Sequence, residues 1–288
     1  MRIGAAAAPR WWGIEPAGLP AYLVHLVATG ATSVELIVHH GSATRDPSSV
    51  HLDRRDWGPA LDEAERVGLH VDVHNSLDPR FRLARWSSDR VGLQGDLVPI
   101  VDLLAEVGRR QTHPPAFVVH AADGCRDARS VTGDVLTWIA AELEARRSTA
   151  HLCVELRAAD GSNDQRFDRD RDRLIGFVDG LDSPRIGMCW DIANDWLTAR
   201  RTCRPLELPT LMPSCVRHGH LHDAAVGGLL HAPLGEGSVP WVEAMTLFAG
   251  AHGDMSVTLE IRYRLAHEVG DPWTVLGDSV RRALSVRN

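Results

Sequence analysis

The chain has 288 residues, 44% of them hydrophobic and 24% charged, which is typical of a globular protein long enough for one large barrel or two ordinary domains. Its 38 acidic residues outnumber its 31 basic ones, and the net charge of -7 argues against nucleic acid or an acidic membrane surface as the default partner. All 31 basic residues are arginines, and the absence of lysine excludes a Schiff-base or lysine general-base mechanism.

Short apolar segments alternate with amphipathic segments eight times along the chain. The apolar segments are predicted strands over Arg2–Ala8, Ser33–His39, Leu69–His74, Ala116–His120, Ala150–Leu156, Arg185–Asp191, Cys215–Leu221 and Ser256–Ile261. The amphipathic segments are predicted helices over Pro16–Ala28, Trp57–Val67, Leu97–Arg109, Val131–Arg147, Phe167–Val178, Asp195–Arg200, Val239–Ala251 and Pro272–Leu284. A long loop is expected over Asn75–Asp89.

This alternation predicts a parallel sheet, and eight such units predict one closed (β/α)8 barrel, the TIM barrel, as a single domain over residues 1–288. A doubly wound open sheet is the alternative, but no G-x-G-x-x-G motif follows the first predicted strand. The sequence contains no linker and no low-complexity tract between the units.

The sequence also bears on the protein's location. The five cysteines are scattered and form no CxxC pair, which is typical of a reduced, cytoplasmic protein. The apolar run at the start is too short for a signal peptide, and no run reaches the roughly 18 residues of a membrane helix. We therefore expect no membrane partner, whereas a homo-oligomer is compatible with the sequence.

Ionisable side chains stand at the carboxyl ends of six successive predicted strands: His74, His120, Glu155, Asp191, His220 and Glu260. In a (β/α)8 barrel these ends converge on one mouth, where active sites lie. Three carboxylates and three histidines would repel and desolvate one another there unless a cation held them. Each residue singly could be explained by an ion pair or a helix cap, but all six together favour a divalent metal.

The stretch Val216–Gly237 is rich in histidine, with four within fourteen residues: His218, His220, His222 and His231. Alternation along a strand places Val216, His218 and His220 on one face. A single histidine is more often a structural hydrogen-bonding group than a ligand. Several that point to one place favour a metal or proton-transfer site.

Several short motifs carry these residues: VEL around Glu35, VELR around Glu155, CWDIAN around Asp191, HGHLHD around His220, PLGEG at Pro233–Gly237 and LEIR around Glu260. In this order they resemble the xylose isomerase-like TIM barrel superfamily, which includes sugar-phosphate isomerases and epimerases, ketose 3-epimerases and endonuclease IV. The resemblance covers nearly the whole chain. It implies a metal held by Glu155, Asp191, His220 and Glu260, with His222 as the second choice for the histidine.

The implied function is a metal-dependent isomerase or epimerase of carbohydrate metabolism, acting on a small polyhydroxylated or ketone-bearing substrate. Glu155 and Glu260 would exchange a carbon-bound proton as base and acid, through an enediolate. Ligation by three carboxylates and one histidine suits Mn, Mg or Co, and added histidines favour Zn. A lyase or dehydratase on the same scaffold, an endonuclease IV-like phosphodiesterase and a non-catalytic metal-stabilised binding barrel are the alternatives.

The chain departs from the pattern of the family that it resembles at particular positions. Asn194 stands where many family epimerases carry a substrate-contacting histidine. Leu156–Arg157 stands where the ketose epimerases carry an Asn-Arg pair, and the essential lysine of xylose isomerase itself has no counterpart. The sugar contacts of those enzymes are therefore not all present.

Endonuclease IV offers a further comparison. His74 and His120 match its extra histidines, which implies either a second metal ion or hydrogen bonds to substrate hydroxyls. His231 matches one ligand of its third metal, but Asn194 and Leu229 stand where the other two would be. Because that set is broken and the net charge is -7, we expect no cleavage of abasic-site DNA.

Residues around the expected ligands are candidates for substrate binding: Trp12, His74, His120, Arg157, Asn194, His222, His231 and Arg262. Trp12 and its neighbour Trp11 either stack on a substrate ring or seal the barrel edge. Arg157 and Arg262 either bind an anion or neutralise the adjacent glutamates. Glu35 is expected to be a structural acid of the barrel, and Arg166–Arg173 a solvated helix face.

Overall fold

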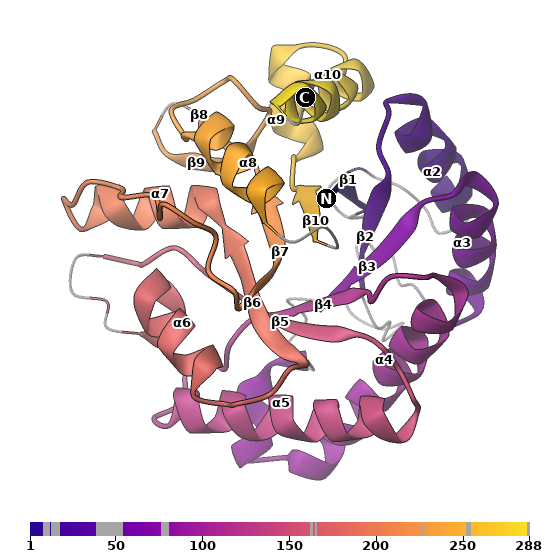
Figure 1. The fold of residues 1–288 in the computed structure, drawn as a ribbon, viewed down its shortest axis with the longest axis vertical. Helices are drawn as coiled ribbons and strands as arrows, with labels where there is room; N and C mark the ends of the chain where they lie inside the picture. Colours follow the sequence, from indigo (N-terminus) through magenta and orange to yellow (C-terminus); the bar gives the residue numbers. More distant parts are fainter. Residues whose placement is uncertain are drawn as a thin grey trace.

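Eight parallel strands close into a barrel in the order β1-β10-β7-β6-β5-β4-β3-β2, and helices surround it (Figure 1). This computed structural model describes residues 1–7, 12, 18–38, 54–75, 81–161, 164, 166–225, 227–251 and 255–286. β1 and β10, from opposite ends of the chain, pair in parallel with Arg2 beside Ser256. The predicted (β/α)8 barrel is therefore confirmed, and the open sheet is excluded.

The barrel strands agree closely with the predicted segments. They are β1 Arg2–Ala7, β2 Ser33–Ile37, β3 His70–His74, β4 Ala116–Val119, β5 His151–Glu155, β6 Ile186–Asp191, β7 Val216–Leu221 and β10 Ser256–Leu259. The helices are α2 Leu19–Ala28, α3 Arg54–Val67, α4 Arg90–Arg110, α5 Ala128–Ala145, α6 Arg171–Asp179, α7 Ile192–Arg201, α8 Trp241–Gly250, α9 Tyr263–Val269 and α10 Pro272–Val286.

β7 shows how the sequence positions the histidines. Side chains alternate along a strand, so His218 and His220 share one face and Gly219 lies on the other. A Cβ atom on Gly219 would lie only 2.6 Å from the Phe248 ring of α8. The glycine therefore lets α8 pack closely, while both histidines are fully buried. The predicted shared face is confirmed for His218 and His220. Val216 does not share it, because the pairing of β7 with β6 shifts register between Val216 and His218.

Three segments differ from their predictions. The helix expected from Leu97 begins at Arg90, because Asp89 caps it by accepting a hydrogen bond from the backbone N–H of Gly92 at 3.1 Å. The loop expected over Asn75–Asp89 contains a 3-10 helix, η3 Leu83–Ser87; residues 76–80 lie outside the described ranges. A second 3-10 helix, η4 Phe167–Arg169, precedes α6 where one continuous helix was expected.

A hairpin that the sequence did not predict follows β7: β8 Asp223–Ala225 pairs antiparallel with β9 Leu229–Ala232. The Asp223 carboxylate holds the following loop by accepting hydrogen bonds from the backbone N–H groups of Gly235, Gly237 and Val239 at 3.0–3.1 Å. The hairpin carries His231 to the carboxyl ends of the barrel strands.

All five cysteines are free thiols, and Cys153, Cys189 and Cys215 are buried. Within the described ranges, no helix combines the length and the apolar character that crossing a membrane requires.

Candidate functional site

Four of the predicted residues meet at the carboxyl ends of the strands. Glu155 ends β5, Asp191 ends β6, His220 lies near the end of β7, and Glu260 follows β10. One possible ligand atom from each lies within 4.8 Å of the others. All four residues are at least 95% buried, with relative exposures of 5%, 0%, 0% and 4%. The implied ligand set is thus brought together in one buried cluster, which we call the acidic cluster.

His220 provides the test of whether this cluster suits a cation. Its Nε2 atom lies 3.1 Å from Oε2 of Glu35, which accepts the N–H. Its Nδ1 atom is buried, has no hydrogen-bond partner among the described residues, and lies 3.5 Å from Glu260 and 3.8 Å from Glu155. A lone pair facing two carboxylates is unfavourable unless a proton or a cation lies between them. The donor set therefore fits a divalent metal.

Asn194 orients two of the carboxylates. Its side-chain amide donates to Oδ2 of Asp191 at 2.5 Å and lies 3.4 Å from Oε1 of Glu155. Its backbone N–H donates to the other Asp191 oxygen at 2.9 Å, because Asp191 is also the N-cap of α7. Asn194, expected as a substrate contact, thus holds the acidic cluster in place and also lines the cavity above it.

His74 and His120 converge on the remaining oxygen of Glu155. Their Nε2 atoms lie 3.2 Å and 2.6 Å from Oε2 of Glu155. The Nδ1 atom of His74 faces the backbone oxygen of Asn75 at 2.6 Å and donates to it, so a neutral His74 would direct a lone pair at the carboxylate. Burial opposes a charge, but Glu155 and the neighbouring acids raise the pKa of His74 to about 9. This position therefore calls for a proton or a second cation.

His222 and His231 lie on the opposite side of the acidic cluster. The backbone N–H of His231 donates to Nδ1 of His222 at 3.0 Å, so Nε2 of His222 carries the proton and points at Asp191, 3.3 Å away. His222 is fully buried and lies behind Asp191, whereas it was expected to contact substrate. His231 does line the cavity, with Nδ1 3.7 Å from a carboxylate oxygen of Glu260. Its φ of 69° is a left-handed conformation that is uncommon outside glycine.

The two proposed proton-transfer residues differ in their electrostatic surroundings. Burial raises the pKa of Glu260 to about 7, and the charge of Glu155 adds to this effect. Burial also opposes ionisation of Glu155, but His120, His220 and His74 hold its pKa well below the usual range. Two carboxylates whose environments push their pKa values apart are typical of acid-base pairs.

A cavity of about 820 Å³ opens above the acidic cluster. Its lining includes most of the residues predicted to bind substrate: His74, His120, Arg157, Asn194, His231 and Arg262. Trp12 does not belong to this lining. It is 6% exposed, donates from Nε1 to the backbone oxygen of Ile261 at 3.0 Å, and packs on Trp273 with ring centroids 5.0 Å apart. Of its two expected roles, this position favours sealing the barrel edge; Trp11 lies outside the described residues.

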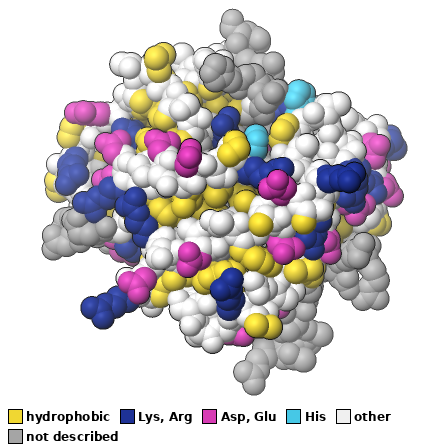
Figure 2. All heavy atoms as spheres, turned by 60° about the horizontal axis from the view of Figure 1, so that its bottom comes forward, with side chains coloured by type: hydrophobic (Ala, Val, Ile, Leu, Met, Phe, Trp, Pro, Cys, Tyr) yellow, Lys and Arg dark blue, Asp and Glu magenta, His cyan; other side chains and the backbone are white. Residues whose placement is uncertain are grey.

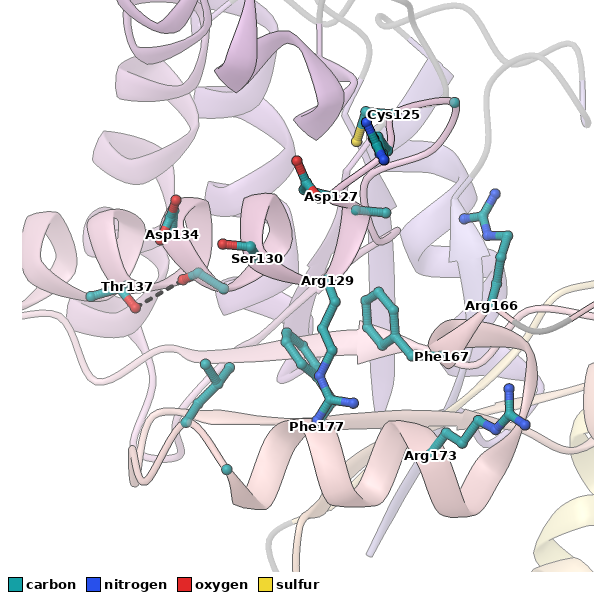
Figure 3. A pocket seen from close by; sticks show the side chains of 16 residues that line it. Cys125, Asp127, Arg129, Ser130, Asp134, Thr137, Arg166, Phe167, Arg173 and Phe177 are labelled. Carbon is teal, nitrogen blue, oxygen red and sulfur yellow. Dashed lines mark hydrogen bonds between the residues drawn. The ribbon is translucent and has the colours of Figure 1, made fainter.

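Another hollow, of about 1160 Å³, lies between α5 and α6 (Figure 3). Arg129 stacks there over Phe177 at 5.6 Å, and Arg166 is paired with Asp123 and Asp168. On the face shown in Figure 2, acidic and basic side chains are interspersed. This hollow contains none of the clusters of possible metal ligands in the described part of the chain, and so it is not the candidate site.

Sequence reasoning missed two features of the site. Glu35 was expected to be a structural acid, but it contacts His220 directly. Arg166–Arg173 was expected to be a solvated face, yet Phe167, Asp168 and Arg169 are buried, and Arg169 lines the cavity. The aromatic residue within that charged run was the available signal, because a phenylalanine anchors the segment to the core.

Comparisons with known proteins agree with this architecture. A structure of D-allulose 3-epimerase from Methylomonas sp. is 12% identical, covers 99% of this chain and 98% of its own, and has a TM-score of 0.68. D-psicose 3-epimerase with D-tagatose from Clostridium cellulolyticum H10 is 15% identical, with coverages of 100% and 98% and a TM-score of 0.65. The probable 3-DHS dehydratase from Bacillus anthracis is 13% identical, with both coverages 100% and a TM-score of 0.62. At these identities the likeness shows the fold alone.

No curated protein matches the chain. The sequence profile of one family, described as the xylose isomerase-like TIM barrel, matches residues 23–281. This match spans most of the chain, including every residue of the acidic cluster and both of the additional histidines, His74 and His120. The protein therefore belongs to the xylose isomerase-like TIM barrel family.

Proposed function

We propose that the protein is a metal-dependent isomerase or epimerase that acts on a small polyhydroxylated or hydroxy-ketone substrate through an enediolate. The observation that carries the proposal is the acidic cluster beneath the cavity, with the buried Nδ1 atom of His220 facing Glu155 and Glu260 at 3.8 Å and 3.5 Å. The fold shared with two sugar 3-epimerases supports this choice of reaction.

Glu155, Asp191, His220 and Glu260 would hold the metal, and His74 and His120 with Glu155 would hold a second ion. The oxygen-rich set suits Mn, Mg or Co, and occupation of the histidine pair would favour Zn. A bound divalent cation would polarise a carbonyl and its neighbouring hydroxyl, and so make the proton on the hydroxyl-bearing carbon more acidic.

The protein's own residues would move that proton. Glu155 and Glu260 flank His220, and both residues line the cavity in which the substrate carbon would lie. In an epimerisation, one carboxylate removes the proton from one face and the other returns a proton to the opposite face. In an isomerisation, the proton returns to the neighbouring carbon. Asn194 and His222 would keep Asp191 in a fixed orientation through their hydrogen bonds.

A dehydratase is the second candidate. The same proton removal, followed by loss of a β-hydroxyl as water, requires the same cluster. The fold similarity to a probable 3-DHS dehydratase supports this alternative.

Incubation of the metal-loaded protein in deuterated water with D-tagatose and related ketoses tests the proposal. We expect deuterium at the carbon next to the carbonyl, and loss of nearly all incorporation in Glu155→Gln and Glu260→Gln with most of the metal retained. Product analysis separates the epimer, the isomer and the dehydrated product. Exchange that persists in both variants would show that the base lies elsewhere, and absence of exchange across a broad panel of ketoses and hydroxy-ketones would contradict the proposal.

A further inference from the structure

Arginine is concentrated in the lining of the cavity above the acidic cluster. Five line it: Arg157, Arg169, Arg201, Arg262 and Arg264. The acids of the same lining are Glu155, Glu260 and Asp160. The first two belong to the acidic cluster, and the side chain of Asp160 is 78% exposed. The cavity therefore has an acidic floor and a basic wall, in a protein whose net charge is -7.

Arg169 is the most unusual member of this wall. Its side chain is only 6% exposed, and its Nε atom has no hydrogen-bond partner among the described residues. One terminal nitrogen donates to the backbone oxygen of Ala158, and another lies 3.5 Å from the exposed Asp160. A buried guanidinium normally requires a well-placed carboxylate, because removing its charge from water is costly.

The nearby acid that could neutralise Arg169 is already engaged. Asp168 lies 3.8 Å from Nε of Arg169, but both of its oxygens accept hydrogen bonds from Arg166, at 3.0 Å and 2.9 Å. Arg166 also pairs with Asp123, whose contact with Arg157 is long, at 3.5 Å. Burial and the neighbouring Arg157 together lower the pKa of Arg169. Positive charge thus accumulates between Arg157 and Arg169 without a matching bidentate acid.

This basic pair also has the right position relative to the chemistry. Arg157 follows Glu155 by two residues and lies near His120. Burial lowers the pKa of His120, Glu155 opposes this effect, and the charge of Arg157 adds to the lowering. A substrate whose oxygens lie over the acidic cluster would extend along the cavity toward Arg157 and Arg169. Guanidinium groups bind carboxylates and phosphates through paired, charge-assisted hydrogen bonds.

We propose that the natural substrate carries an anionic group, a carboxylate or a phosphate ester, and that Arg157 and Arg169 bind it. The position of the reacting end rests on the proposed function, but the anion site does not. A neutral ketose would leave Arg169 with only its long contacts to Asp160 and Asp168, at 3.5 Å and 3.8 Å, so the site discriminates in favour of acidic sugars.

Two probes test the anion site without depending on catalysis or on sugar stereochemistry. Inorganic phosphate and malonate are titrated calorimetrically into the metal-loaded protein, at constant ionic strength set with chloride. We expect at least one anion to bind, and Arg157→Gln and Arg169→Gln each to weaken it by about tenfold or more. Arg281→Gln removes the same charge from an exposed pair with Asp278 and should leave binding unchanged. If Arg169→Gln fails to fold, the less buried Arg157 decides the question.

A matched substrate series then separates the two kinds of anion. D-tagatose, D-tagatose 6-phosphate and D-tagaturonate differ at one end, which is neutral, a phosphate ester or a carboxylate. We expect one of the two acids to bind about tenfold more tightly than the neutral sugar, with the preference lost in Arg157→Gln.

The outcomes distinguish this inference from the proposed function. Anion binding that depends on Arg157, without deuterium exchange in any compound, would leave the anion site standing and remove the isomerase. Efficient exchange of neutral ketoses, with no arginine-dependent binding of phosphate, malonate or either acid, would overturn the anion site and keep the isomerase.

Discussion

The carboxylate of Glu35 accepts a hydrogen bond from Nε2 of His220 at 3.1 Å, across the barrel interior and 185 positions apart in the chain. The same oxygen lies 2.7 Å from Nε2 of His218. By accepting the Nε2 proton of His220, Glu35 leaves the lone pair on Nδ1, the atom that faces Glu155 and Glu260. A carboxylate that fixes the tautomer of a metal-binding histidine also makes that histidine a better ligand.

Replacement of Glu35 should therefore weaken metal binding without removing a ligand. In Glu35→Gln the amide can donate to Nε2, which would place the proton on Nδ1. We expect a loss of about ten- to a hundredfold in metal affinity, measured by competition with a chelator of known affinity. Glu63→Gln, on the surface of α3, is the matched control. An unchanged affinity in a folded Glu35→Gln protein would show that Glu35 is only structural.

Metal content tests the acidic cluster itself. Purified protein should contain at least one divalent ion per chain, and adding metal should raise its melting temperature, because a ligand that binds only the folded state stabilises it. Asp191→Ala and His220→Ala should lose the ion, as judged by elemental analysis of the dialysed proteins. The site would be contradicted if the purified protein contained no metal and if no added divalent ion changed its melting temperature.

The second ion can be located separately. If His74 and His120 bind a metal with Glu155, His74→Ala should release one of two ions and retain the other. If they bind substrate hydroxyls instead, the metal content should stay the same while KM rises. Elemental analysis and steady-state kinetics of the same preparation separate the two outcomes, and His113→Ala, an exposed histidine, provides the control.

Trp12 should affect stability rather than recognition. Trp12→Ala removes a buried ring that packs on Tyr22, Tyr263 and Trp273, so we expect a loss of about 3–5 kcal/mol in the free energy of unfolding. Chemical denaturation measures this loss. Because Trp12 does not line the cavity, KM in the folded fraction should change little. A rise in KM with unchanged stability would instead restore its expected role as a stacking platform.

The sequence by itself determined the barrel and the acidic cluster. Both follow from local patterns. Alternation of strands and helices predicts a parallel barrel, and in a parallel barrel the carboxyl ends of all strands lie at the same end. Glu155 and Asp191 could thus be placed together from their positions on successive strands. The histidine face of β7 follows from the period of two along a strand.

Only the tertiary structure decided which side chains meet across the barrel. Glu35 reaches His220, and His222 turns behind Asp191, because of the closure and register of strands far apart in sequence. Trp12 packs against α10 and Arg169 is buried beside the cavity for the same reason. A sequence pattern specifies which face of an element is buried, but the partner of each buried side chain depends on how distant elements pack.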